Sequence, residues 1–237
     1  MIAFVVAVAD QARFEAVAAP ALERVRESDS VVMTLAGDGP LQPALNAALD
    51  ELADMPDLEA AVIVHDDVAL LDVDTAAIVR RAFADPEVAL AGVIGTQGVA
   101  GLAWWEAATA VGRAGSPHVP GGAIVGAAPA GVVDALDGIV LCLAPWAVRT
   151  LRFDEDLAAD FHGYDVDLCF QARHHGRRVE VVELAAHHEH RPLFGDGDAW
   201  VRNELRFQRR WMEGRIVTER RHRALSPAAG QAPAQAG

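Results

Sequence analysis

The chain has 237 residues, 52% of them hydrophobic and 23% charged, which is the composition of an ordinary globular protein with a sizeable core. Its formal net charge is −14 and every basic residue is arginine, so nucleic acid is disfavoured as a general partner. No stretch approaches the roughly 20 apolar residues of a transmembrane helix, and the first residues lack the basic segment of a signal peptide. We therefore expect a cytoplasmic protein without a transmembrane segment; peripheral attachment to a membrane and a homo-oligomer both stay open.

In the first hundred residues, apolar runs alternate with stretches of helical periodicity. Continuous apolar runs predict buried strands, and apolar repeats of three to four residues predict helices. The expected strands are residues 2–8, 30–35, 61–64 and 88–94, and the expected helices are 14–25, 41–52 and 74–83, the last capped by Asp74. This alternating order predicts a parallel, right-handed α/β layer.

The second half of the chain continues the α/β pattern with longer loops. The expected strands are 139–143 and 178–186, and the expected helices are the later part of 161–175 and 198–221. Residues 112–131 are rich in glycine and proline and predict a flexible loop or lid, and 223–237 predict a disordered tail after one domain spanning 1–222. Cys142 and Cys169 lie in apolar segments and are expected to be buried thiols rather than a disulfide.

Three polar residues, His65-Asp66-Asp67, follow the apolar strand at 61–64. In open α/β sheets, ligands bind beyond the carboxyl ends of the strands. Buried carboxylates there need a cation or water to satisfy them. Oxygen ligands suit Mg²⁺ and Mn²⁺, and the imidazole favours Mn²⁺. The motif therefore predicts a divalent metal site; the alternative is a polar turn whose acids cap the next element.

Two later segments also carry acids and histidines. In residues 162–167, Asp165 and Asp167 stand at the start of a helix. Asp165 is a candidate general base, and the alternative is helix capping, which we expect for Asp167. Residues 187–190 (His-His-Glu-His) follow a strand and predict metal ligands; the alternative is a solvated turn.

Trp104 and Trp105 follow the glycine-bearing segment 95–98. Paired indole rings predict a stacking platform for a sugar, and the alternative is packing in the core or in an interface. No lysine or arginine lies between Arg26 and Arg80, a span that contains the predicted metal motif. A metal ion would then supply the positive charge.

Taken in order, these motifs resemble those of the family 2 inverting nucleotide-sugar glycosyltransferases of GT-A fold. They are most similar to bacterial glycosyltransferase-like proteins tied to capsule and surface-polysaccharide assembly. The matching segments are 64–68 (Val-His-Asp-Asp-Val), 92–95 (Gly-Val-Ile-Gly), 136–139 (Leu-Asp-Gly-Ile), 161–169 (Phe-His-Gly-Tyr-Asp-Val-Asp-Leu-Cys) and 187–188 (His-His). The resemblance covers about residues 2–212 and implies an α/β, Rossmann-like three-layer fold with a mixed, mainly parallel central sheet and helices on both faces.

The resemblance also assigns roles by position. Asp165 stands where the family has its catalytic base, and Asp67 where its D-x-D motif binds Mn²⁺ or Mg²⁺; His65 replaces the leading acid of that motif. The late metal-binding histidine is His188, with His190 second. The positions implied for the donor are Val8, Asp10, Gly37, Asp38, Asn46, Asp66, Asp137 and Gly138. The positions implied for the acceptor are Trp104, Trp105 and Tyr164, the last in place of a family acid.

The sequence thus predicts an enzyme that transfers a sugar, with inversion, from a nucleoside diphosphate donor to a glycan or lipid-linked acceptor. A UDP-sugar is the favoured donor. In such a reaction Asp165 would deprotonate the acceptor hydroxyl as it attacks the anomeric carbon. Two alternatives stay open. One is a metal-dependent phosphoesterase or nucleotidyltransferase that uses the same acids and histidines, and the other is a non-catalytic sugar-binding protein that keeps the fold.

Overall fold

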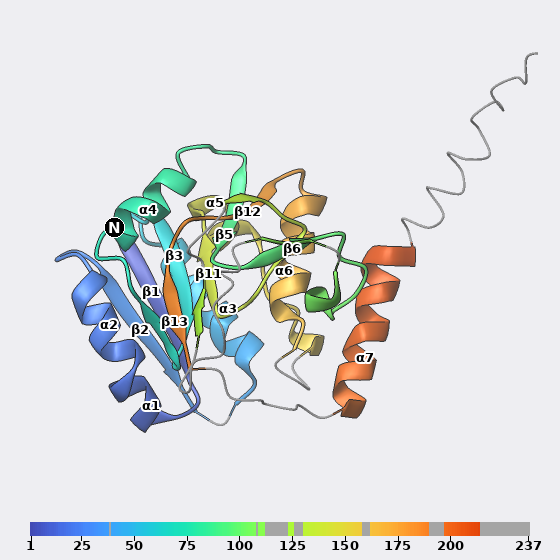
Figure 1. Cartoon of the computed structure of the whole chain (residues 1–237), viewed down its shortest axis with the longest axis horizontal. Coiled ribbons are helices and arrows are strands. Elements are labelled where there is room, and N and C mark those ends of the chain that lie inside the picture. Colours follow the sequence, from blue (N-terminus) through green and yellow to red (C-terminus); the bar gives the residue numbers. More distant parts are fainter. Residues whose placement is uncertain are drawn as a thin grey trace, which may run out of the picture.

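A mixed β-sheet forms the centre of the molecule (Figure 1). The computed structural model describes residues 1–37, 39–107, 109–111, 123–125, 130–157, 162–189 and 197–213. Within these residues the sheet has seven strands, in the order β2 (Val31–Ala36), β1 (Ile2–Val8), β3 (Ala60–His65), β11 (Val140–Leu143), β5 (Val88–Gly92), β12 (Arg178–Val181) and β9 (Gly131–Val132). Strands β2, β1 and β3 are parallel, as are β5 and β12, whereas β11 is antiparallel to both of its neighbours and β9 is antiparallel to β12.

The central strands are apolar on both faces because helices cover the sheet from both sides. In β1, Ala3 and Val5 belong to one core, and Ile2, Phe4 and Val6 belong to the other. The first core also contains residues of α3 (Leu41–Ala53), α5 (Pro145–Thr150), α6 (Tyr164–His174) and α7 (Gly197–Phe207). The second contains residues of α2 (Ala18–Val25) and α4 (Thr75–Ala82). The predicted three-layer α/β fold with a mixed, mainly parallel sheet is therefore confirmed.

Two smaller sheets accompany the central one. In the first, β6 (Gly95–Gln97) pairs with β10 (Ala135–Leu136) and β7 (Thr109–Val111). In the second, β13 (Ala186–His188) pairs antiparallel with β4 (Val68–Leu70) and β8 (Ala123–Val125). Strand β8 and the start of β9 fall within the glycine-rich stretch predicted as a loop, and most of that stretch lies outside the described residues, as does the predicted tail.

Three expected elements are interrupted in the structure. The helix expected at 14–25 is two helices, α1 (Gln11–Ala16) and α2, because Pro20 has no N–H to bond the preceding turn. The strand expected at 178–186 leaves the central sheet after β12 and resumes as β13 in another sheet. The helix expected at 198–221 passes from α7 into a π-helical turn at Gln208–Met212, and residues beyond 213 are outside the described part.

Of the two predicted helix caps, Asp74 has the predicted position without the capping bond, and Asp167 is not a cap. Asp74 occupies the cap position of α4, but its side chain makes no capping bond. Thr75 instead donates its hydroxyl to the carbonyl of Asp72 (2.6 Å). The buried carboxylate of Asp167 accepts hydrogen bonds from the Trp211 indole and the Gln171 amide, each at 2.7 Å, and so ties α6 to the π-helical turn.

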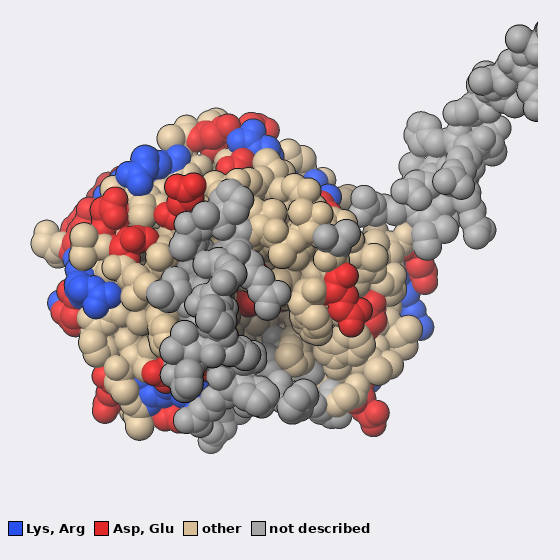
Figure 2. All heavy atoms as spheres, viewed as in Figure 1, with Lys and Arg blue, Asp and Glu red and all other residues tan. Residues whose placement is uncertain are grey.

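The charged surface and the two cysteines agree with what the sequence predicts. On the face shown in Figure 2, acidic and basic side chains are interspersed around the molecule. Cys142 and Cys169 are buried and unpaired, as predicted, and burial raises the pKa of the Cys142 thiol to about 12. Among the described residues, no helix has the length and apolar character needed to cross a membrane.

The sheet topology brings several polar chain segments to one edge. Strands β2, β1 and β3 run in parallel, so their carboxyl ends lie together, and the antiparallel strand β11 begins at that same edge. The N–H of His65 donates to the carbonyl of Ile139 (3.2 Å). The Asp137-Gly138 turn before β11 therefore lies beside the His65-Asp66-Asp67 motif.

Candidate active site

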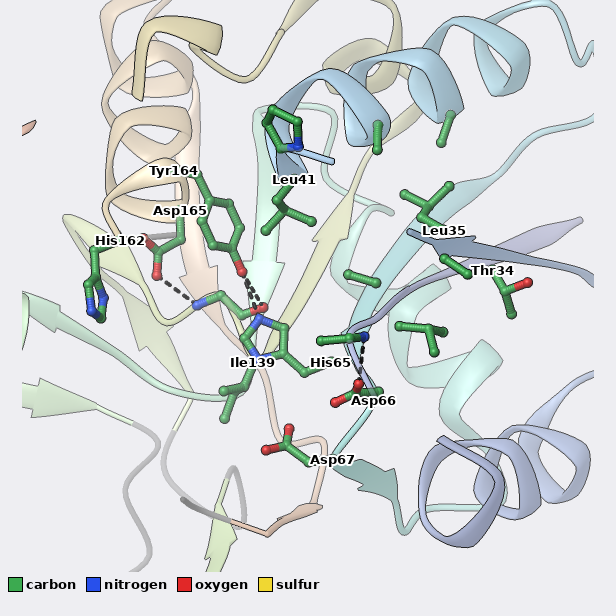
Figure 3. Close-up of a pocket in the computed structure, with 18 of the residues that line it drawn as sticks. Thr34, Leu35, Leu41, His65, Asp66, Asp67, Ile139, His162, Tyr164 and Asp165 are labelled. Carbon is green, nitrogen blue, oxygen red and sulfur yellow. Dashed lines mark hydrogen bonds between the residues drawn. The ribbon is translucent and has the colours of Figure 1, made fainter. Parts of the chain in front are cut away.

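A cleft of about 1100 Å³ opens at this edge of the sheet (Figure 3). Most of the predicted site residues line it: Val8, Gly37, His65, Asp66, Asp67, Trp104, Trp105, Asp137, Gly138, Tyr164, Asp165 and His188. Asp10 and Asn46 are not among its lining residues. Asp38 and His190 lie outside the described residues. The folded chain thus gathers residues from distant motifs into one space.

Three predicted metal ligands lie close together. The ligand atoms of His65, Asp67 and His188 are all within 4.8 Å of one another. The pairing of β13 with β4 places His188 opposite Val68, and the Nε2 of His188 is 3.5 Å from the Asp67 Oδ2. The N–H of Glu189 also donates to the carbonyl of Asp67 (2.9 Å), which holds the late histidine segment against the motif.

Asp67 has a buried carboxylate oxygen that a cation could satisfy. The residue is only 7% exposed, and its Oδ1 has no hydrogen-bond partner within the described part of the chain. Burial opposes ionisation, but the contacts with His188, His65 and Arg13 outweigh it and lower the pKa of Asp67. An unpaired buried carboxylate oxygen costs free energy that a bound ion would recover. Two imidazoles and a carboxylate fit a divalent ion such as Mn²⁺ better than Mg²⁺, which prefers oxygen ligands.

Asp165 is a buried carboxyl at the start of α6. Gly163, which precedes the helix, has φ of 92°, a left-handed conformation that favours glycine. The Oδ2 of Asp165 accepts the N–H of Gly138 and its Oδ1 accepts the N–H of Val166, both at 2.8 Å. Burial, together with the charge of Asp137, raises the pKa of Asp165 to about 7. A carboxyl with such a pKa can accept a proton near neutral pH, as a general base must.

Tyr164 connects the two halves of the cleft (Figure 3). Its hydroxyl lies 2.8 Å from the Nε2 of His65 and donates to the carbonyl of Gly138 (3.2 Å). Burial lowers the pKa of His65, which keeps the ring neutral, the form that binds metals. Burial also raises the pKa of Tyr164, so its hydroxyl keeps its proton.

Three of the predicted donor-binding residues hold the backbone around the cleft. The Oδ2 of Asp66 accepts the N–H groups of Ala9 and Asp10, both at 2.8 Å, and so fixes the turn after β1. The Oδ1 of Asp10 in turn accepts the N–H of Arg13 (3.1 Å) and so caps α1. Asn46 exchanges two hydrogen bonds with the backbone of Phe153, at 2.8 and 3.0 Å. Contacts of these residues with a donor stay predictions.

Arg13 is a cleft residue that none of the sequence motifs indicated. It lies in α1 with only 14% of its side chain exposed. Its guanidinium is 3.4 Å from the Asp10 Oδ2 and 3.9 Å from the Asp67 Oδ2. Among the described residues that line the cleft, Arg13 is the only lysine or arginine. The sequence feature that could have indicated Arg13 is the Asp10-x-x-Arg13 spacing directly after the first strand.

The two tryptophans lie in a short 3-10 turn, Trp104–Glu106. Their ring centroids are 6.0 Å apart and the planes meet at 82°, so the rings are edge to face rather than parallel. Trp105 is 53% exposed, which leaves its ring open to a ligand. Helix α7 supports the chain just before this turn, because the Glu204 carboxylate accepts the N–H of Leu102 (2.7 Å).

The fold, and a cleft that holds both a buried acid and a His-Asp-His cluster, fit a glycosyltransferase-type enzyme. The chain belongs to the glycosyltransferase-like family, whose model (Glycosyltransferase like family) matches residues 3–209. The streptomycin biosynthesis protein StrF of Streptomyces griseus is 32% identical over 225 residues, which are 90% of this chain and 75% of that protein. The crystal structure of A197 from STIV shares the fold, with a TM-score of 0.52 at 12% identity over 79% of this chain and 84% of that one.

Proposed function

We propose that this protein is a metal-dependent, inverting glycosyltransferase that uses a nucleoside diphosphate sugar, with UDP-sugars favoured. The observation that carries the proposal is the placement of Asp165 in the same cleft as the His65, Asp67 and His188 cluster. Membership of the family supports the transfer of a sugar. The buried acid and the cluster support a reaction that needs both a base and a divalent ion.

His65, Asp67 and His188 would hold the ion, and Mn²⁺ is the favoured one. A divalent ion supplies positive charge that stabilises the departing diphosphate without a proton transfer. The unpaired Oδ1 of Asp67 supports this assignment, because a bound ion gives that oxygen the partner it lacks.

Asp165 would act on the acceptor. Its carboxylate accepts the proton of the acceptor hydroxyl as that oxygen attacks the anomeric carbon. The new carbon–oxygen bond forms on one face, and the bond to the donor phosphate breaks on the other. The nucleoside diphosphate leaves with the electrons of that bond, so a single displacement inverts the sugar. A general base of this kind contributes typically about 10²–10⁴-fold to the rate.

Arg13 supports a donor that carries phosphates. Its guanidinium lies 3.9 Å from the Asp67 Oδ2, so a phosphate near the predicted metal ligands would be within its reach. The planar guanidinium matches phosphate oxygens and stays charged at all relevant pH values. Arg13 therefore adds a fixed positive charge to the one that an ion would supply.

The remaining cleft residues keep their predicted roles. Val8, Gly37, Asp66, Asp137 and Gly138 are the proposed donor contacts. Trp104 and Trp105 are the proposed acceptor contacts. The similarity to a streptomycin biosynthesis protein makes a small hydroxylated metabolite an acceptor to test beside glycans and lipid-linked glycans.

The two other candidate functions have weaker support. Phosphoester hydrolysis commonly uses two ions about 3.5–4 Å apart. The described residues contain one cluster of metal-capable side chains rather than two. Burial raises the pKa of Asp165, which supports a general base, a role that a protein that only binds sugars does not require.

Titration calorimetry with UDP, GDP, CDP and dTDP, each with and without Mn²⁺, tests the proposal. We expect at least one nucleotide to bind only when Mn²⁺ is present. Asp67→Ala should abolish this Mn²⁺-dependent binding. Asp165→Asn should bind as the wild type does but release nucleoside diphosphate from the donor roughly 100-fold more slowly or worse. The control is Asp156→Ala, which removes a carboxylate that is 74% exposed and outside the cleft lining. Near-normal turnover by Asp165→Asn would contradict the proposal.

A further inference from the structure

Tyr164 is the single tyrosine of the chain, and its hydroxyl is enclosed by protein groups. The residue is 4% exposed, and the hydroxyl lies between the imidazole of His65 and the carbonyl of Gly138 (Figure 3). Its ring packs beside Phe153, with the ring centroids 5.8 Å apart. The hydroxyl therefore has two fixed neighbours, one at the predicted metal cluster and one beside the predicted base.

The hydrogen bonds of the Tyr164 hydroxyl favour one tautomer of His65. A tyrosine hydroxyl has one proton, and a carbonyl can only accept. Tyr164 therefore gives its proton to the Gly138 carbonyl, at 3.2 Å. With that proton used, we infer that the Nε2 of His65, 2.8 Å away, donates to the hydroxyl oxygen. In a neutral imidazole this leaves Nδ1 with its lone pair, available to a metal ion.

Gly138 is shaped to fit this arrangement. A Cβ at this position would collide with the Tyr164 hydroxyl and would lie 3.3 Å from the Cβ of Asp165. The N–H of Gly138 donates to Asp165, while its carbonyl accepts from Tyr164. Two adjacent residues of α6 thus bind both backbone groups of one glycine, and the first of them also reaches His65.

We propose that Tyr164 is a positioning residue that fixes the tautomer of His65 and so presents Nδ1 to the metal ion. The metal part of this inference rests on the proposed function; the tautomer part does not. The resemblance implies an acceptor contact for Tyr164, but its hydroxyl is already bonded to two protein groups. A residue that bonds the non-ligating nitrogen of a metal-binding histidine typically lowers metal affinity by about 10- to 100-fold when it is removed.

Nuclear magnetic resonance of the metal-free full chain, labelled with ¹⁵N in its histidines, reads the tautomer directly. Long-range proton–nitrogen correlations distinguish Nε2–H from Nδ1–H, and the spectrum of His65→Gln assigns the His65 ring. We expect Nε2–H in the wild type and loss of that pure state in Tyr164→Phe, which keeps the ring and removes only the hydroxyl. A wild-type ring protonated on Nδ1, or an unchanged tautomer in Tyr164→Phe, would overturn the proposal.

Calorimetric titration with Mn²⁺ alone tests the link to the metal. Tyr164→Phe should weaken Mn²⁺ binding by about 10- to 100-fold in the wild-type background and by nothing further in a His65→Ala background. Additive losses in the double variant would mean that Tyr164 acts on the fold rather than through His65. If the wild type takes up no Mn²⁺, the metal dependence of the proposed function fails, and the tautomer spectra still decide the role of Tyr164.

Discussion

Replacing Asp165 with asparagine should change how the stability of the protein depends on pH. Burial and the Asp137 charge raise the pKa of Asp165 from 3.8 to about 7 in the folded protein. The folded state therefore keeps a proton that the unfolded chain has already lost, so stability falls as the pH rises from about 4 to about 7. One pKa unit corresponds to about 1.4 kcal/mol, which makes the loss about 4 kcal/mol over this window and about 3 kcal/mol above pH 5.

Asparagine does not titrate, so the variant should escape this loss. Its free energy of unfolding, relative to that of the wild type, should rise by about 3 kcal/mol between pH 5 and pH 8. The difference in unfolding free energy at any single pH also includes the cost of a lost hydrogen bond. The carboxylate accepts from both Gly138 and Val166, whereas an amide has only one acceptor oxygen. Only the change with pH tests the reasoning. A residue needed for transfer would then be one that costs stability at working pH.

Urea unfolding followed by circular dichroism, at pH values from 5 to 8, measures this difference. EDTA keeps divalent ions from biasing the charge of Asp165. Val166→Ala is the control, because it trims a fully buried neighbour without removing a titrating group, so its curve should run parallel to that of the wild type. Parallel curves for the wild type and Asp165→Asn would refute the argument that burial raises this pKa.

Two further variants test other contacts of the cleft. Arg13→Ala should weaken the Mn²⁺-dependent binding of UDP by roughly tenfold or more, because charge-assisted hydrogen bonds to the phosphates are lost. The binding of uridine, which has no phosphate, should not change. Calorimetry that finds equal losses of affinity for both ligands would exclude a phosphate contact. Glu204→Ala should lower the free energy of unfolding in urea by about 1–3 kcal/mol, because the partly buried N–H of Leu102 loses its acceptor. The variant should also be cleaved faster by proteases near Leu102. An unchanged digestion pattern would show that α7 does not support the tryptophan turn.

The fold was predictable because its elements are encoded locally. Strands β1, β3, β5 and β11 are apolar runs, and α2, α3 and α4 have apolar repeats, so the order and type of these elements follow from the pattern. The pattern did not show where the chain passes from the central sheet to a smaller one. Residues 178–186 predict one strand because valine, leucine and alanine recur from β12 to the start of β13, although the two strands pair with different partners. Pairing is a property of distant residues, and an apolar run does not record it.

The site was predictable in its acids and histidines but not in the contacts among them. The ordered motifs indicated Asp67, Asp165 and His188. Arg13 and Asp67 come together only because parallel β1 and β3 end side by side, so no local pattern joins them. Tyr164 was placed by position in its motif, yet its hydroxyl bonds His65, which is 99 residues away in sequence.

The antiparallel direction of β11 is what makes a single site from these segments. Its pairing with β3 sets Val140 beside Val64, so the turn at Asp137-Gly138 lies at the end of β3. A four-residue strand spans about 13 Å, and a parallel β11 would carry that turn to the opposite edge of the sheet. Asp165 would then lose the N–H that holds its carboxylate, and Tyr164 would lose the carbonyl that takes its proton. The contacts that join the predicted base to Tyr164, and through it to His65, therefore depend on one reversal of chain direction, which the uniformly apolar sequence of β11 does not encode.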